Sequence, residues 1–130
     1  MENIGKRATR FARISYLFAG VYGFLCLVPL LFVEGKFAEA FPPAISHPEF
    51  YYGFIFVGLA WQMAFVLIGR DPVRYRPLMI ATLVEKFGYA GSVFAMIALG
   101  RAVPGMAGGA LMDTALGVLF LIAYFKTPKN

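Results

Sequence analysis

Residues 50–69, FYYGFIFVGLAWQMAFVLIG, form a continuous stretch without a formal charge. A helix needs roughly 20 mostly apolar residues to cross a hydrocarbon layer about 30 Å thick, and this stretch has that length. Three further stretches of similar length and character lie at 14–33, 77–100 and 102–125. The sequence therefore predicts an all-α integral membrane protein with four spanning helices.

The composition of the chain points to the same class. Of the 130 residues, 60% are apolar and only 15% are charged, and the mean hydropathy is +0.71. In soluble domains about a quarter of the residues are charged. Outside the four apolar stretches too few residues remain for a second domain, so we expect a single transmembrane domain over residues 1–130.

The charges between the apolar stretches alternate in sign. Basic residues precede the first stretch, separate the second from the third and follow the fourth: Lys6, Arg7, Arg10, Arg13, Arg70, Arg74, Arg76, Lys126 and Lys129. The loop 34–49 is instead acidic on balance. The positive-inside rule then predicts that both termini and the middle loop are cytoplasmic and that the loop 34–49 faces outward. Because short connections make neighbouring helices antiparallel, we expect an antiparallel four-helix bundle.

Several functional classes are not supported by the sequence. The net charge of +5 does not indicate a nucleic-acid partner, because the basic residues lie at helix ends and not in one patch. The sequence has no H-E-x-x-H, G-x-G-x-x-G, P-loop or C-x-x-C motif. One cysteine, Cys26, and one histidine, His47, make a poor metal site. We therefore predict no catalytic residue, no metal and no nucleic-acid partner.

Three ionisable residues, Glu85, Lys86 and Asp113, interrupt the third and fourth stretches. Helical periodicity places small residues on the same stripes as the two carboxylates, namely Ala81, Gly88, Ser92 and Ala95 with Glu85, and Gly105, Gly109 and Gly117 with Asp113. Because small-residue faces favour close packing of membrane helices, we expect both carboxylates to point into the bundle. The rise per residue puts them at similar depth, where Lys86 can reach between them.

Two interpretations of these three residues remain open. In the structural one, Lys86 and Asp113 form an interhelical ion pair that sets the helix register. Glu85 is then neutral or bonded to a nearby polar group, for which the candidates are Gln62, Thr82, Ser92, Thr114 and a tyrosine hydroxyl. In the functional one, Glu85, Lys86 and Asp113, with Gln62 and Ser92, line a binding pocket or proton path that opens beneath the loop 34–49.

Two loops hold further candidate residues. The outer loop 34–49 contributes Glu34, Glu39, His47 and Glu49. Its many apolar residues predict either an interfacial cover on the membrane surface or a lid over a ligand. His47 can sense pH or ligate a metal, but a surface position in the first turn of the second span is favoured. The middle loop contributes Arg70, Arg74 and Arg76, which either serve topology alone or contact anionic headgroups or a partner.

Further sequence features lie near both ends of the chain. Arg10 and Arg13 precede the first span, Gly20 and Gly23 lie within it, and residues 109–117 read GALMDTALG near the end of the chain. With these features the sequence resembles the DoxX-like group of small four-helix bacterial membrane proteins. The resemblance implies the bacterial inner membrane, and for some members an accessory role in quinone-linked oxidation. Small multidrug resistance transporters also have four helices, but they carry a carboxylate midway along the first, and residues 14–33 contain no acid.

The leading functional hypothesis is an accessory or hydrophobic-ligand-binding membrane module without catalysis of its own. The alternative is a proton-coupled carrier or a quinone-linked redox subunit that uses Glu85, Lys86 and Asp113. No cofactor is predicted apart from a quinone in that alternative. Membrane lipids are the expected partners, together with a second copy of the chain or a larger membrane complex, since small-residue stripes also serve association between chains.

Overall fold

The computed structural model describes residues 2–129, with side chains from residue 6 onward. Within this range the chain is all-helical, with α1 (Glu2–Leu30), α2 (Glu34–Ala40), α3 (Pro48–Arg70), α4 (Leu78–Ala98), a short 3-10 helix η1 (Pro104–Met106) and α5 (Ala107–Lys126). The helices α1, α3, α4 and α5 each contain a segment long and apolar enough to cross a membrane. The predicted all-α class with four long apolar helices is thus confirmed.

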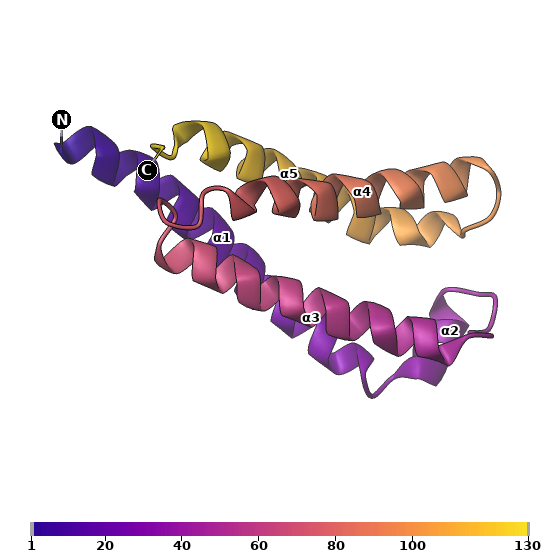
Figure 1. Ribbon diagram of the computed structural model, residues 1–130. Helices are drawn as coiled ribbons and strands as arrows, with labels where there is room; N and C mark the ends of the chain where they lie inside the picture. Colours follow the sequence, from indigo (N-terminus) through magenta and orange to yellow (C-terminus); the bar gives the residue numbers. More distant parts are fainter. Residues whose placement is uncertain (1, 130) are drawn as a thin grey trace.

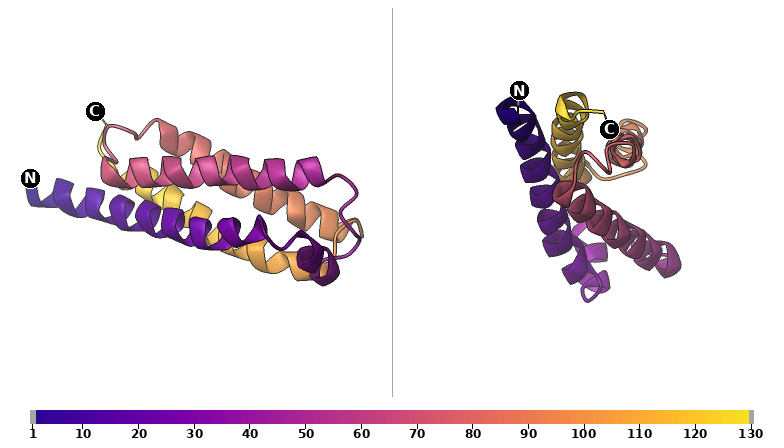
Figure 2. Two further views of the ribbon diagram at one scale, coloured as in Figure 1. Left: turned by 90° about the horizontal axis from the view of Figure 1, so that it is seen from below. Right: turned by 60° about the vertical axis from the view of Figure 1, so that its left-hand side comes forward.

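The long helices form two antiparallel pairs, α1 with α3 and α4 with α5 (Figure 1). The pairs meet mainly through α1 and α5, whereas α3 and α4 contact each other little. Both termini and the 71–77 loop lie at one end, which we call the closed end. At the other end, the open end, lie α2 and the 99–103 loop, and there the two pairs diverge (Figures 1 and 2).

A buried aromatic core joins the two pairs toward the closed end. Tyr16 of α1 stacks on Phe120 of α5, with 4.0 Å between ring centroids and 7° between ring planes. Phe65 of α3 meets both rings edge-on. The Tyr16 hydroxyl and Thr82 Oγ1 of α4 share a hydrogen bond of 2.7 Å, which satisfies the polar atom that this ring takes into the core. All four long helices therefore meet at this core, which we call the aromatic core.

Glycines allow α1 and α3 to approach each other closely. A Cβ at Gly20 would lie 2.8 Å from the side chain of Val66, and one at Gly69 would lie 2.7 Å from that of Leu17. At Gly23 a Cβ would overlap the side-chain amide of Gln62. The packing of α1 on α3 thus explains two of the residues that carry the resemblance described above.

The stripes of small residues beside Glu85 and Asp113 pack closely against other helices only in part. A Cβ at Gly88 or Gly109 would meet nothing within 4 Å, whereas one at Gly117 would meet the ring of Phe87 at 2.8 Å. Small residues permit close approach but do not cause it. Where the two pairs diverge, the space beside Gly109 stays open.

Several boundaries differ from those expected. The last long helix, expected at 102–125, begins at Ala107 after the short helix η1. α1 spans Glu2–Leu30 where the sequence predicts a span at 14–33. It begins earlier because a helix can continue through charged residues outside the apolar span, and it ends one residue after Pro29, which cannot donate a helical hydrogen bond. The expected outer loop 34–49 contains the short helix α2.

Candidate functional site

A cavity of about 550 Å³ lies between the two helix pairs, between the aromatic core and the open end. Its lining residues come from all four long helices, from α2 and from η1. Cavities that bind small molecules usually measure about 300–1,000 Å³. The divergence of the two pairs therefore produces a space of the size that a small ligand needs.

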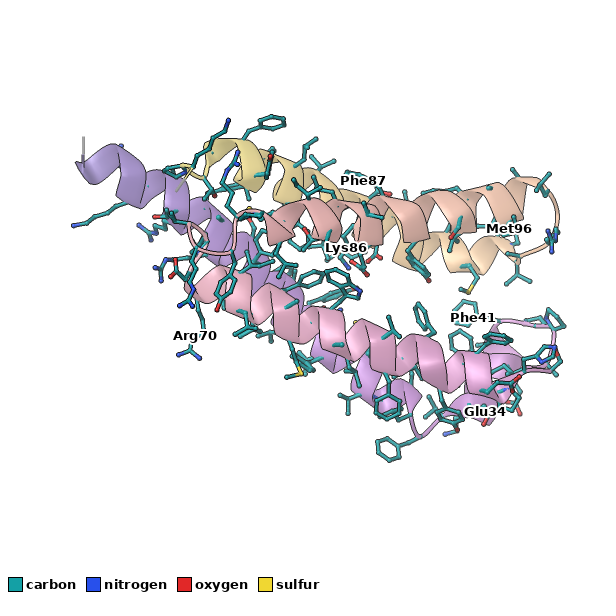
Figure 3. All side chains as sticks on the ribbon, viewed as in Figure 1. Glu34, Phe41, Arg70, Lys86, Phe87 and Met96 are labelled. Carbon is teal, nitrogen blue, oxygen red and sulfur yellow. The ribbon has the colours of Figure 1, made fainter. Side chains whose placement is uncertain are left out.

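The inner part of the cavity is polar and consists of Gln62, Glu85, Lys86 and Asp113, which we call the polar floor. Lys86 Nζ donates a hydrogen bond to Asp113 Oδ1 at 3.1 Å and lies 3.5 Å from Glu85 Oε2. Lys86 is only 4% exposed and projects between α4 and α3 (Figure 3). The interhelical ion pair of the structural interpretation is therefore present, and it lines a cavity, as the functional interpretation requires.

The polar floor rests on the aromatic core. Lys86 Nζ lies 5.2 Å from the centroid of the Phe65 ring, within the range of a cation–π contact. Gln62 is 3% exposed, and its Nε2 donates to the backbone oxygen of Gly58 at 2.9 Å. Phe65 thus contacts the lysine from the side of the aromatic core, and the Gly58 oxygen, itself at the cavity, holds the amide.

Two acceptor atoms of the polar floor have no hydrogen-bond partner. These are Gln62 Oε1 and Glu85 Oε2, both buried. Buried polar atoms in proteins nearly always have a partner, so each such atom needs an explanation. The lysine and the two carboxylates together carry a formal charge of −1. The polar floor therefore has an excess of formal negative charge and two buried acceptors without a hydrogen bond, of which Glu85 Oε2 still contacts Lys86 Nζ at 3.5 Å.

The walls toward the open end are apolar and aromatic. They are formed by Tyr22, Leu27, Leu30, Phe37, Phe50, Phe54, Tyr89, Met106 and Met112. Phe54 of α3 stacks on Tyr89 of α4 with 5.6 Å between ring centroids, so this contact joins the two pairs beside the cavity. The cavity is thus amphipathic, with polar groups at its inner end and apolar side chains along its length.

The segment around α2 lies at the mouth of the cavity. Phe37 lines the cavity and packs against Tyr51 and Phe41, with ring centroids 5.5 Å and 5.0 Å away. Phe41 in turn reaches the other helix pair, where its ring would lie 3.4 Å from a Cβ at Gly105 (Figure 3). This contact joins the two helix pairs at the mouth of the cavity. It is compatible with both interpretations of the loop 34–49, an interfacial cover and a lid over a ligand.

The four candidate residues of the outer loop lie outside the cavity lining. Glu34 accepts a hydrogen bond from the Tyr52 hydroxyl at 2.9 Å. His47 Nδ1 lies 3.1 Å from Glu49 Oε1 at the exposed start of α3, and Glu39 is exposed on α2. Within residues 2–129, no group of three or more His, Cys, Asp and Glu side chains is placed to hold a metal ion.

The serine and threonine hydroxyls that the sequence offers as alternative partners of Glu85 bond elsewhere. Ser92 is exposed and donates to the backbone oxygen of Tyr89, and Thr114 donates to that of Ala110, both at 2.8 Å. Thr82 bonds to Tyr16 and to its own helix. Serine and threonine in a helix readily bond to a carbonyl three or four residues earlier, and here that local bond replaces the one to Glu85.

The three arginines of the middle loop have different surroundings. Arg76 Nε donates to the backbone oxygen of Thr127 at 2.8 Å, and its guanidinium lies 4.0 Å from the centroid of the Tyr124 ring. Arg76 thus joins the middle loop to the end of α5. Arg70 and Arg74 are exposed at the closed end, where Arg70 projects away from the helices (Figure 3).

Sequence reasoning did not find the aromatic walls. Tyr22, Phe50, Phe54 and Tyr89 stand among many other aromatic residues, and no spacing separates those that line a cavity from those that face outward. In comparisons with protein-family models, curated proteins and solved structures, none matches this chain. The resemblance to the DoxX-like group stays a prediction.

Proposed function

We propose that the chain is a multi-pass protein of the bacterial inner membrane. The helices α1, α3, α4 and α5 cross this membrane, and both termini are cytoplasmic. Large apolar side chains on these helices are 60–71% exposed: Leu25, Phe56, Val57, Met63, Val84 and Leu111. Apolar surface of this extent on a soluble monomer is unusual. The closed end carries exposed arginines while the open end carries Glu34, Glu39 and Glu49, which supports a cytoplasmic closed end.

Cysteine labelling tests this orientation. In a Cys26→Ser background, Ser46→Cys at the open end should react with a membrane-impermeant maleimide in intact spheroplasts. Lys129→Cys at the closed end should react only after the membrane is permeabilised, because the positive-inside rule places that end in the cytoplasm. The reverse pattern, or equal labelling of both positions in intact spheroplasts, would reject the orientation.

We further propose that the protein binds an amphiphilic molecule in the cavity, with the head of the ligand on the polar floor and its apolar part along the walls. The observation that supports this most directly is the amphipathic cavity of about 550 Å³, whose polar floor contains two buried acceptors without a hydrogen bond. The role proposed is binding, as in an accessory or lipid-handling module, without catalysis of its own.

A proton-coupled carrier is the second candidate, because an ionisable cluster lies within reach of one end of the bundle and the aromatic core closes the other end. Ionisable groups within membrane spans often mark proton or substrate paths. A ligand flux into vesicles that depends on a proton gradient and disappears in Glu85→Gln would favour the carrier. Co-purified quinone in a larger complex would favour the redox subunit instead.

Two neighbouring glycines of α5 offer a matched test of ligand binding. A Cβ at either Gly108 or Gly109 would meet nothing within 4 Å, so leucine should be tolerated at both positions, but only Gly109 lines the cavity. Gly109→Leu should lower the occupancy of a retained amphiphile by about tenfold or more, equivalent to about 1.4 kcal/mol, because the new side chain fills ligand space.

Native mass spectrometry of gently extracted protein measures this occupancy, and Gly108→Leu is the control. Wild type and Gly108→Leu should retain the same bound molecule at similar occupancy. If Gly109→Leu retains it equally well, the ligand lies elsewhere and the proposed site is wrong. The mass of the molecule also distinguishes a membrane lipid from a quinone.

A further inference from the structure

We propose that the ligand of this cavity carries a protonated amine at its polar end, so that the site selects single-chain lipophilic ammonium compounds. The proposal rests on the ligand-binding function above and adds the chemistry of the ligand's head. Three features of the cavity support it: the formal charge of the polar floor, the kind of buried atom left without a hydrogen bond, and the aromatic walls.

The charge of the polar floor favours a cation. Lys86 lies between Asp113 and Glu85, at 3.1 and 3.5 Å, and it is the only lysine or arginine among the cavity-lining residues that the structure describes. When both carboxylates are ionised, one negative charge is therefore not balanced. Removing an unbalanced charge from water costs several kcal/mol, and a cationic head would compensate it. An anionic head would instead add to the excess.

Two buried atoms of the polar floor make no hydrogen bond. Gln62 Oε1 and Glu85 Oε2 are both acceptors, and Glu85 Oε2 has only its 3.5 Å ion-pair contact with Lys86. The amide orientation of Gln62 is set by the bond from its Nε2 to Gly58, which leaves the oxygen as the free atom. An ammonium group has three N–H donors and no acceptor, so it matches this arrangement. A quinone has only carbonyl acceptors and would leave both atoms without a hydrogen bond.

The aromatic walls add a third argument. Tyr22, Phe54 and Tyr89 line the cavity beside the polar floor. The faces of aromatic rings attract cations, by about 0.5–2 kcal/mol for each well-placed contact. Beyond these rings, Leu27, Leu30 and Met106 continue the lining toward the open end, where a hydrocarbon tail would lie.

Three probes with the same twelve-carbon tail separate charge from donor capacity. Dodecylamine at neutral pH has both a positive charge and N–H donors, dodecyltrimethylammonium has the charge alone, and dodecanol has a donor without charge. We expect dodecylamine to bind wild-type protein in phosphatidylcholine nanodiscs about tenfold more tightly than either of the others, after subtraction of binding to protein-free nanodiscs. This ratio corresponds to about 1.4 kcal/mol.

A carboxylate-to-amide pair of variants tests the site. Glu85→Gln should weaken dodecylamine binding by about tenfold and leave dodecanol binding unchanged, because it removes charge at the polar floor and keeps the shape. Asp71→Asn makes the same chemical change at an exposed position of the closed end, and it should alter neither. Because the probe comparison uses the wild-type chain, the test does not depend on the folding of Glu85→Gln.

The outcomes separate this inference from the proposed function. If dodecanol or dodecyltrimethylammonium binds as tightly as dodecylamine, the ammonium inference is overturned and the cavity remains a ligand site. If no probe shows saturable binding, the inference is also overturned. The proposed function fails as well only if Gly109→Leu retains its bound molecule at the wild-type level.

Discussion

Replacement of Lys86 by methionine is expected to lower the free energy of unfolding by about 3–5 kcal/mol, the range measured when one partner of a buried ion pair is removed. Lys86 is 4% exposed and is the only cation within 4 Å of Glu85 and Asp113 among the described residues. Its loss would leave two partly buried carboxylates without a counter-charge. Thermal unfolding in a neutral detergent, followed by circular dichroism, measures the effect.

Two further variants test why the Lys86→Met protein loses stability. Lys36→Met removes an exposed lysine of α2 and should change stability little. The triple variant Glu85→Gln, Lys86→Met and Asp113→Asn removes all three charges together and should recover most of the lost stability, since neutral replacements of buried ion pairs are often as stable as the pair. A Lys86→Met protein as stable as wild type would contradict this expectation and show that the two carboxylates do not need Lys86 as a counter-charge, as when they are protonated.

The triple variant also bears on the two interpretations of Glu85, Lys86 and Asp113. If it is as stable as the wild type and no longer retains a ligand, the three residues serve binding. If it retains the ligand and only its stability changes, they serve the packing of α4 on α5.

Gly23→Ala is expected to lower the free energy of unfolding by about 1–3 kcal/mol, the usual cost of inserting atoms into a closely packed interior. A Cβ at this position would overlap the side-chain amide of Gln62. The amide can move away only if it breaks its bond to the Gly58 oxygen or if α1 shifts away from α3. The same thermal unfolding measurement applies.

The control for Gly23→Ala is Gly53→Ala, because a Cβ at Gly53 would meet nothing within 4 Å and alanine favours the helix by up to about 1 kcal/mol. A double variant identifies the cause. Since the nearest atoms to a Cβ at Gly23 all belong to Gln62, adding Gln62→Ala should make the total loss smaller than the sum of the single losses. Additive losses would contradict the proposed contact.

Part of the candidate site could be predicted from the sequence. The depth of Glu85 and Asp113 along their helices follows from the rise per residue, and a lysine between two carboxylates at similar depth has few other partners. The observed contacts of Lys86 with Asp113 and Glu85 agree with this reasoning. The partners of Ser92 and Thr114 could not be predicted in the same way, because each hydroxyl can choose between a distant carboxylate and a nearby backbone oxygen.

The sequence by itself determined that the chain has four long apolar helices, because hydrophobic length is a property of each segment alone. Only the tertiary structure decided that these helices form two pairs, that Gly23 makes room for Gln62, and that the pairs diverge around a cavity. Such features depend on which side chains from distant segments meet at each contact. Packing of that kind is specific to pairs of surfaces, and the periodicity of one helix contains no information about the surface of its neighbour.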